Sequence, residues 1–401
     1  MQHLLDSGSS RPGECGHGSG PRLYESSDTF VAGYESSDTF VDTFVANTPA
    51  PGVGLLRASP QGTILRHMTL RNLVFEGGGV KGMAYVGALQ VLEARGLLGD
   101  VRNVAGTSAG AITAALVAVG ATAEELSAVL GSTDFATFMD GPGWVFRDTS
   151  RLVKHYGLYE GDVFEQWCRQ QIGQITARVL GEAQPDLTFA RLEALARRDP
   201  GRFRQLFVVT TNLTRQLPEV FSASTRPEVP LWRAVRMSMS IPLFFEAVQF
   251  EQGVYVDGGV SWNYPIDLFD GVRRQAVLGL PEVPPEVGVS PETLGFFLGT
   301  REEIAAARKD WQPLPVPITG LKSYTQALFS FMLHTSSRLH VDELALGRTV
   351  FIDNAGVGTT DFTLSDERKQ QLVDNGVLAT TEWFEHNAER TPPARVVGAG
   401  N

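Results

Sequence analysis

Short apolar runs alternate with amphipathic stretches along the chain from about residue 66 onward. The runs are bounded by glycine or polar residues, as is typical of buried strands. The stretches between them repeat apolar residues at helical spacing. This alternation predicts an α/β fold with a mostly parallel central sheet and helices on both faces. The expected strands are 71–76, 101–105, 205–211, 254–257, 294–298 and 349–352, and the expected helices are 83–98, 111–119, 123–130, 161–172, 187–198, 320–346 and 365–387.

The two ends of the chain differ in composition from this central part. A seven-residue pattern at Tyr24–Phe30 recurs ten residues later at Tyr34–Phe40, within flanks rich in Gly, Ser and Pro. Such low-complexity sequence cannot bury enough apolar surface to order itself. We therefore expect residues 1–65 to form a disordered tail, 66–390 to form one folded domain, and 391–401 to form a flexible C-terminal tail.

Composition and charge exclude several classes of protein. Hydrophobic residues make up 43% and charged residues 20%, which is ordinary for a globular chain. The net charge of −11 argues against nucleic acid as a partner and against simple electrostatic adhesion to anionic lipid. Neither a signal peptide nor an apolar run of membrane-spanning length is evident. We expect a cytoplasmic or peripheral membrane protein, with secretion by a route without a signal peptide still open.

Cysteine and histidine give no sign of a disulfide framework or a metal site. Cys15 and Cys168 are the two cysteines, and one of them lies in the expected tail. The seven histidines are scattered without the spacing of metal-ligand pairs. We expect neither a metal nor another cofactor.

The stretch Gly106–Gly110 places Ser108 between two glycines, directly after an expected strand and before an expected helix. This is the sequence form of a nucleophile elbow, in which a sharp turn exposes the serine hydroxyl. The N-terminus of the following helix would favour the negative charge that develops when a serine attacks an ester. The alternative is a chance match in a glycine-rich chain.

A second glycine motif follows the expected strand 71–76. Gly77, Gly78 and Gly79 are followed by Lys81 and Gly82, and consecutive glycines expose backbone N–H groups that suit an oxyanion. The same residues satisfy Gly-x-Gly-x-x-Gly, so a dinucleotide site is an alternative. An acidic residue at the end of the second strand is missing, which disfavours it. A phosphate-binding P-loop is less favoured still, since no Gly-Lys-Ser/Thr ending is present.

The third motif is Asp257 followed by Gly258 and Gly259, at the end of an expected strand. Asp-Gly is also a common turn signal, so a hairpin is the alternative when the motif is taken alone. Placed at a strand end, the carboxylate can face the turn of a neighbouring strand. With its ordinary pKa it would be ionised at neutral pH but a weak base, so the oxyanion hole must lower much of the barrier.

In this order, the three motifs resemble the patatin-like phospholipase family. Arg236–Pro242 and Asn263–Pro265 are also similar, and the likeness covers about 73–269 and continues more loosely to about 383. The resemblance implies a three-layer α/β/α acyl hydrolase domain in which Ser108 is the nucleophile and Asp257 its side-chain partner, without a histidine. It implies an oxyanion hole at Gly77, Gly78 and Gly79, with Lys81, Gly82, Gly106, Gly110, Gly258 and Gly259 as supporting motif residues.

This resemblance implies hydrolysis of lipid carboxylic esters by a phospholipase A or lysophospholipase, with a lipid ester as substrate. One alternative is an α/β-hydrolase esterase whose Ser-Asp-His triad would draw on His334, His340 or His386. Another is a non-catalytic nucleotide-binding protein that uses the glycine-rich loop to hold a ligand. For peripheral membrane contact, the candidate is the loop 138–159, which contains Trp144, Val145 and Phe146, and a core-packed connection is its alternative.

Overall fold

The computed structural model describes residues 69–140, 154–271, 273, 288–309, 315 and 317–388. The two expected tails lie outside these residues, and so does the centre of the candidate membrane loop, with Trp144, Val145 and Phe146. The strands are β1 (Asn72–Phe75), β2 (Asn103–Thr107), β3 (Gly157–Tyr159), β4 (Gln205–Asn212), β5 (Leu217–Phe221), β6 (Leu243–Phe245), β7 (Val248–Phe250), β8 (Gly253–Asp257), β9 (Thr293–Gly299) and β10 (Thr349–Asp353). The helices are η1 (Gly79–Met83), α1 (Ala84–Ala94), η2 (Leu97–Gly99), α2 (Ala109–Ala118), α3 (Ala123–Ser132), η3 (Phe135–Phe138), α5 (Asp162–Leu180), α6 (Phe189–Arg198), α7 (Leu231–Ser238), α8 (Gly259–Trp262), α10 (Arg301–Ala307), α11 (Leu321–Arg338), α12 (Glu343–Gly347) and α13 (Asp366–Ala388).

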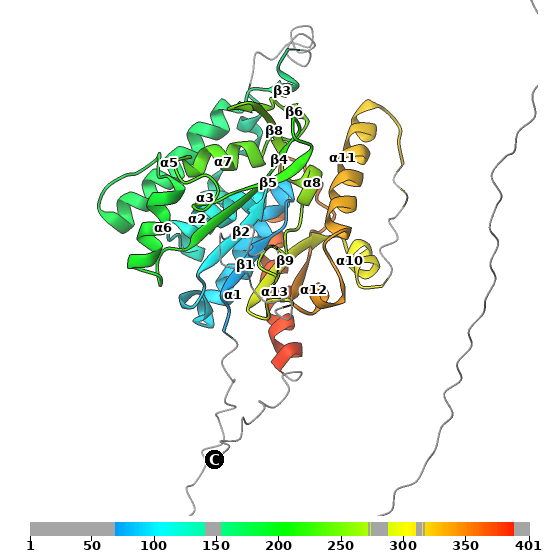
Figure 1. Cartoon of the computed structure of the whole chain (residues 1–401). Helices are drawn as coiled ribbons and strands as arrows, with labels where there is room; N and C mark the ends of the chain where they lie inside the picture. The colour runs from blue at the N-terminus through cyan, green and yellow to red at the C-terminus, as the bar shows by residue number, and fades with distance from the viewer. Residues whose placement is uncertain are drawn as a thin grey trace, which may run out of the picture. The chain divides into compact units, whose positions relative to one another are not determined.

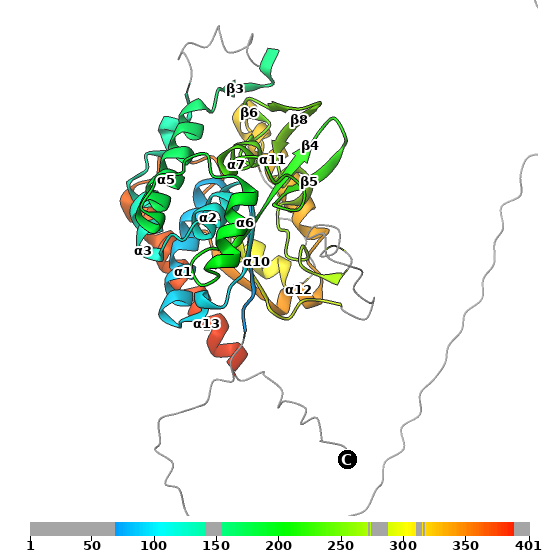
Figure 2. The same ribbon diagram turned by 60° about the vertical axis from the view of Figure 1, so that its left-hand side comes forward.

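The main sheet has the strand order β10-β9-β1-β2-β4-β8-β7, with β5 paired to β4. The five strands from β10 to β4 are parallel to one another, whereas β5, β7 and β8 pair in antiparallel fashion. Helices cover both faces, as Figures 1 and 2 show. The helices that pack on one face of the sheet are α1, α2, α3, α5, α6, α7 and α13. Those that pack on the other face are α8, α10 and α12. The predicted mixed α/β fold is therefore confirmed.

The strand that carries Asp257 departs from the expected parallel arrangement. β8 runs antiparallel to β4, and its last residue pairs with Thr210 near the carboxyl end of β4. The preceding residue of β4, Val209, pairs on the other side with Thr107 at the end of β2. Asp257 therefore reaches the carboxyl edge of the sheet from the opposite direction, separated from β2 by β4.

Close helix packing explains two glycines that lie far apart in the sequence. A Cβ atom at Gly87 of α1 would lie 1.9 Å from the Val373 carbonyl oxygen, and one at Gly376 of α13 would lie 2.0 Å from the Ala84 carbonyl oxygen. Only glycine permits these backbones to approach so closely.

The expected cap of the last helix is also present, because Arg368 N donates to Ser365 Oγ at 3.4 Å.

The stretch 320–346, expected to be one helix, forms two. The break at 339–342 ends α11 and starts α12, whose N-cap Asp342 accepts a hydrogen bond from Ala345 N at 2.7 Å. An aspartate satisfies the free N–H groups at a helix start, so it favours a new helix over the continuation of the old one. None of the helices among the described residues combines the length and apolarity needed to cross a bilayer.

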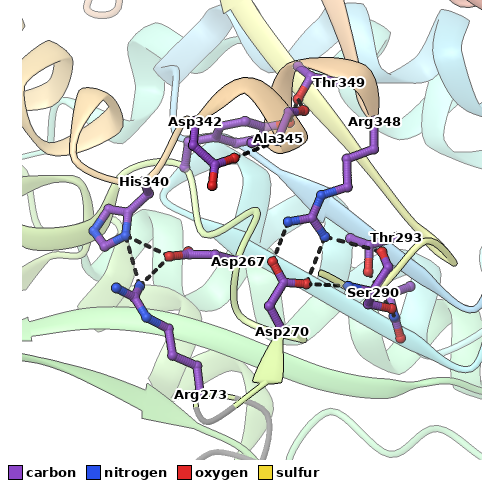
Figure 3. Close-up of polar contacts among 12 residues, drawn as sticks. Asp267, Asp270, Arg273, Ser290, Thr293, His340, Asp342, Ala345, Arg348 and Thr349 are labelled. Atoms are coloured by element: carbon purple, nitrogen blue, oxygen red, sulfur yellow. Dashed lines mark hydrogen bonds and ion pairs between the residues drawn. The ribbon is translucent and has the colours of Figure 1, made fainter. Parts of the chain in front are cut away.

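A cluster of polar side chains links the segment that follows α8 to the amino ends of β9 and β10 (Figure 3). Arg348, directly before β10, donates from both terminal nitrogens to Asp270, with Nη1 2.8 Å from Oδ1. Ser290 N, shortly before β9, donates to the same carboxylate at 2.8 Å. This two-pronged ion pair orients the segment that leads out of the Asp257 motif, at the edge of the sheet opposite the motif itself.

Candidate active site

Ser108 has the strained backbone that its motif predicts. Its φ of 53° and ψ of −124° lie in a region that non-glycine residues rarely adopt, and it is the N-cap of α2. Its N–H donates to Ser238 Oγ at 2.8 Å, and that hydroxyl donates to the Val209 carbonyl at 2.6 Å. The end of α7 thus holds the turn between β2 and α2 in place.

The flanking glycines of this motif are required by close packing. A Cβ at Gly110 would lie 2.3 Å from the Phe75 carbonyl oxygen, and one at Gly106 would lie 2.2 Å from the Gly110 carbonyl oxygen. A side chain at Gly110 would push α2 away from the end of β1, and one at Gly106 would push it away from β2. The glycines let the helix start immediately above the sheet edge, so that its N-terminal N–H groups point to the site.

Asp257 lies fully buried beside this turn. Gly259 N donates to its Oδ1 at 2.7 Å, and its own N–H donates to the Ser240 carbonyl at 2.8 Å. The Ser108 hydroxyl interacts with the carboxyl group and lowers its pKa, but it is oriented toward Met239 Sδ at 3.4 Å. Among the described residues, Oδ2 of Asp257 therefore has no hydrogen-bond partner of ordinary geometry. The side chains of Ser108 and Asp257 therefore lie next to each other, and Oδ2 of Asp257 is free to accept a further hydrogen bond.

Burial raises the pKa of Asp257 from an ordinary 3.8 to about 7, and the Ser108 hydroxyl and the Gly259 N–H limit the rise by favouring the charged form. The expectation of a weak base is therefore wrong for this environment. A carboxylate with a pKa near neutrality accepts a proton far more readily and is still about half ionised at pH 7.

The glycine-rich loop lies directly against the serine. A Cβ at Gly77 would be 3.2 Å from Ser108 Cβ, and Gly79 has a left-handed φ of +59°. Gly77 N donates to the Asn263 carbonyl at 3.1 Å, so this amide is engaged, unlike the expectation that all three glycines offer free donors. No acceptor among the described residues pairs with Gly78 N or Gly79 N, and these two remain available.

Glu76, at the base of this loop, is a buried acid that none of the sequence motifs indicated. Its Oε1 accepts hydrogen bonds from Asn263 Nδ2 at 3.0 Å and Ser337 Oγ at 2.8 Å, and Oε2 accepts one from Leu298 N at 2.8 Å. Burial raises the pKa of Glu76 to about 8, and the Leu298 amide and the charge of Lys81 oppose that rise. A charged residue directly after an apolar strand was the signal that could have found it.

Lys81 and the remaining motif glycines complete the loop surroundings. Lys81 is nearly buried and lines a pocket of about 200 Å³ together with Gly77. A Cβ at Gly82 would lie 3.1 Å from Ala109 Cβ, where η1 packs on the start of α2. Cβ atoms at Gly258 and Gly259 would lie 2.2 Å from the Val209 carbonyl oxygen and 2.3 Å from a Leu333 methyl carbon, respectively. The glycines thus bring the three motifs together.

The three candidate histidines have partners elsewhere. His334 Nε2 lies 3.4 Å from Glu303, and His386 Nδ1 lies 2.8 Å from the carbonyl of Glu382 in its own helix. His340 contacts Asp267 and Arg273, as Figure 3 shows. No contact joins any of them to Ser108 or Asp257 among the described residues, so a triad has no geometric support.

The site offers no set of metal ligands. Across the part of the chain that the structure describes, no group of three or more His, Cys, Asp or Glu side chains is arranged to hold a metal ion. The chemistry available at the site is that of a serine hydroxyl, a buried carboxylate and backbone amides.

A strand-to-helix serine turn on a three-layer α/β/α fold is typical of hydrolases that act on esters. This chain belongs to the patatin-like phospholipase family, whose match covers residues 73–270. YqhO of Bacillus subtilis (strain 168), an uncharacterized protein, is 32% identical over 319 residues, which are 77% of this chain and 95% of that protein. Membership of this family of lipid hydrolases supports hydrolysis of lipid esters.

Two further comparisons agree with this assignment. Protein 463L of Invertebrate iridescent virus 6, named a probable lipid hydrolase, is 25% identical over 218 residues, 52% of this chain and 67% of that protein. The crystal structure of VipD from Legionella pneumophila superimposes with a TM-score of 0.50 at 20% identity, covering 79% of this chain and 67% of that one. The similarity to VipD concerns the fold alone.

Proposed function

We propose that this chain is a serine acyl hydrolase that cleaves carboxylic esters of lipids, with phospholipids and lysophospholipids as the first substrates and neutral acylglycerols or small esters as others. The observation that carries the proposal is the position of Ser108. Its strained turn at the N-terminus of α2 lies beside a fully buried carboxylate, Asp257, and against the glycine-rich loop. Strain of this kind is retained where the surrounding structure maintains it for function.

In the proposed mechanism, Ser108 Oγ attacks the ester carbonyl carbon while its proton passes to Asp257. The open Oδ2 is the oxygen that would accept this proton once the hydroxyl turns away from Met239. The raised pKa of Asp257 supports this role, since a base with a pKa near the working pH both accepts and returns a proton efficiently.

The negative charge that develops on the carbonyl oxygen needs preorganised donors. Gly78 N and Gly79 N would supply them, while Gly77 contributes space beside Ser108 and the dipole of α2 adds to the field. Asp257 then returns its proton to the leaving alcohol, and the C–O bond breaks to leave an acyl-serine. Water then gives a proton to the same carboxylate and attacks the acyl carbon. The bond to Ser108 Oγ breaks, Asp257 returns the proton to that oxygen, and the fatty acid leaves.

A fluorophosphonate probe tests the assignment directly. Wild-type protein should be labelled at Ser108, Ser108→Ala should not be labelled, and Asp257→Asn should react about a hundredfold to ten-thousandfold more slowly. Ser132→Ala, which removes an exposed serine on α3, is the matched control and should react like wild type. Intact mass and peptide mapping identify the labelled residue.

Three outcomes would contradict the proposal. Undiminished labelling of Ser108→Ala would place the nucleophile elsewhere. Thermal stabilisation by nucleotides in a protein that the probe does not label would favour the nucleotide-binding alternative. Loss of ester hydrolysis on replacement of His334, His340 or His386 one at a time would favour the triad.

A further inference from the structure

Helix α11 has two faces of different character. Its inner face is buried: Leu333 lies against Gly259, and Ser336 Oγ accepts a hydrogen bond from Asn263 N at 2.8 Å. Its outer face carries Tyr324, Leu328 and Phe331 at the spacing i, i+4 and i+7, and these side chains are 52%, 42% and 64% exposed. Large apolar groups in one exposed stripe are the usual mark of an interaction surface. We call these three residues the α11 stripe.

The α11 stripe belongs to a segment with an unusual charge pattern. Residues 311–341 contain no Asp or Glu, although the whole chain carries a net charge of −11. The same segment contains Lys322 and Arg338, and Arg338 is exposed. This segment therefore differs from the acidic remainder of the molecule, and it would not repel an anionic surface.

The position of α11 connects this stripe to the candidate active site. Ser337 Oγ on the inner face donates to Glu76 at 2.8 Å, at the base of the glycine-rich loop. The helix packs beside α8, which directly follows Asp257 and Gly258 (Figure 1). Because a helix is roughly 10 Å across, the stripe lies about one helix diameter from the residues that surround Ser108.

We propose that the α11 stripe docks on an anionic lipid surface, inserting its apolar side chains among the lipids with the site close by. This inference rests on the proposed function, because the substrate of a lipid acyl hydrolase lies in such a surface. A second protein chain fits less well, since three partly exposed side chains offer far less than the roughly 800 Å² per partner that a standard interface buries. An apolar helix face that is followed by an exposed arginine on the same side, as Arg338 follows Phe331, fits the pattern that binds at a bilayer interface.

Vesicle binding tests the proposal without depending on catalysis. In a Ser108→Ala background, the triple change Tyr324→Ser, Leu328→Ser and Phe331→Ser should weaken binding to vesicles of equimolar phosphatidylcholine and phosphatidylserine by at least about tenfold. Leu378→Ser, which removes an apolar residue of 58% exposure on α13, is the matched control and should bind normally. Cosedimentation gives the partition coefficient, and circular dichroism confirms that the variants are folded.

Enzyme assays in the active background separate this proposal from the proposed function. The triple change should lower hydrolysis of vesicle phospholipid by at least about tenfold while hydrolysis of a soluble short-chain ester falls less than about twofold. A wild type that hydrolyses neither vesicle phospholipid nor a soluble ester would refute the proposed function, while the vesicle-binding assay would still decide the role of α11. Equal vesicle binding by folded parent and triple variants, or a parent dimer that the triple change dissolves, would overturn the docking proposal.

Discussion

At the scale of single residues, the environment of Asp257 changes what its sequence position suggests. An aspartate after a strand has an ordinary pKa of 3.8, yet burial raises the pKa of this one to about 7. The raised pKa changes both the energy of ionising this carboxyl group and its strength as a base. A buried carboxylate loses solvation when it ionises, so it retains protons more strongly and becomes a better base for a serine hydroxyl.

The raised pKa predicts the pH dependence of the proposed reaction. Asp257 must be ionised to accept the serine proton, so kcat/KM for a soluble ester should be constant above the pKa and fall about tenfold per pH unit below about pH 7. Initial rates across the acidic range measure this, with circular dichroism to show that the protein stays folded. A constant kcat/KM down to about pH 5 would contradict the role of Asp257 as base.

Glu76 predicts an effect on stability. Its pKa is raised from 4.5 to about 8 in the folded state, so the folded protein holds the proton more tightly than the unfolded chain does. The stabilisation is complete below about pH 4.5 and is lost as the pH rises through about 8. Urea unfolding should therefore show the free energy of unfolding falling by a few kcal/mol over this range, and Glu76→Gln should flatten the fall.

A matched control identifies the source of that pH dependence. Glu385→Gln removes an exposed acid on α13 and should leave the pH dependence of unfolding as in wild type. If Glu76→Gln gave the wild-type dependence, the buried carboxyl would not be the group that binds the extra proton.

At the scale of elements, close approach of α1 and α13 predicts opposite effects for two Gly→Ala changes in helices. Gly376→Ala would place a methyl 2.0 Å from the Ala84 carbonyl oxygen, so it should destabilise the protein by about 1–3 kcal/mol. Gly131 of α3 has no atom within 4 Å of an added Cβ, and Gly131→Ala should stabilise by about 0.5–1 kcal/mol. Urea unfolding compares the two, and stabilisation by Gly376→Ala would contradict the observed packing.

At the scale of the whole molecule, we propose that residues 66–390 form the complete acyl hydrolase domain. Every element that positions the site lies between Asn72 and Ala388. Deletion of residues 1–65 should therefore change kcat/KM for a soluble ester by less than about twofold. Steady-state kinetics and thermal unfolding of both forms measure this, and a loss above about tenfold would show that the N-terminal residues contribute to the folded domain.

The distribution of charge is also a property of the whole molecule. The net charge of −11 argued against simple electrostatic adhesion to anionic lipid. The net charge is a sum over the chain, whereas a membrane surface meets only the charges near it, because screening limits their reach to roughly 10 Å. The acid-free segment 311–341 is visible in the sequence, but the folded structure was needed to show that its helix exposes an apolar face.

Sequence by itself determined the elements and motifs whose signals are local. Alternating apolar runs predicted most strands within a few residues, and the glycines around Ser108 predicted its strained turn, because backbone sterics act between neighbours. The order of the three motifs was sufficient to indicate the patatin-like family. Ser365 likewise marked the start of α13, since a cap acts within one turn.

Tertiary structure alone decided what depends on residues far apart in the chain. The reversed direction of β8, the engagement of Gly77 N by Asn263 and the burial of Glu76 under α11 join segments that lie about 45 to 260 positions apart. The raised pKa of Asp257 has the same origin, because desolvation arises from all the groups packed around a carboxyl and not from its neighbours in sequence.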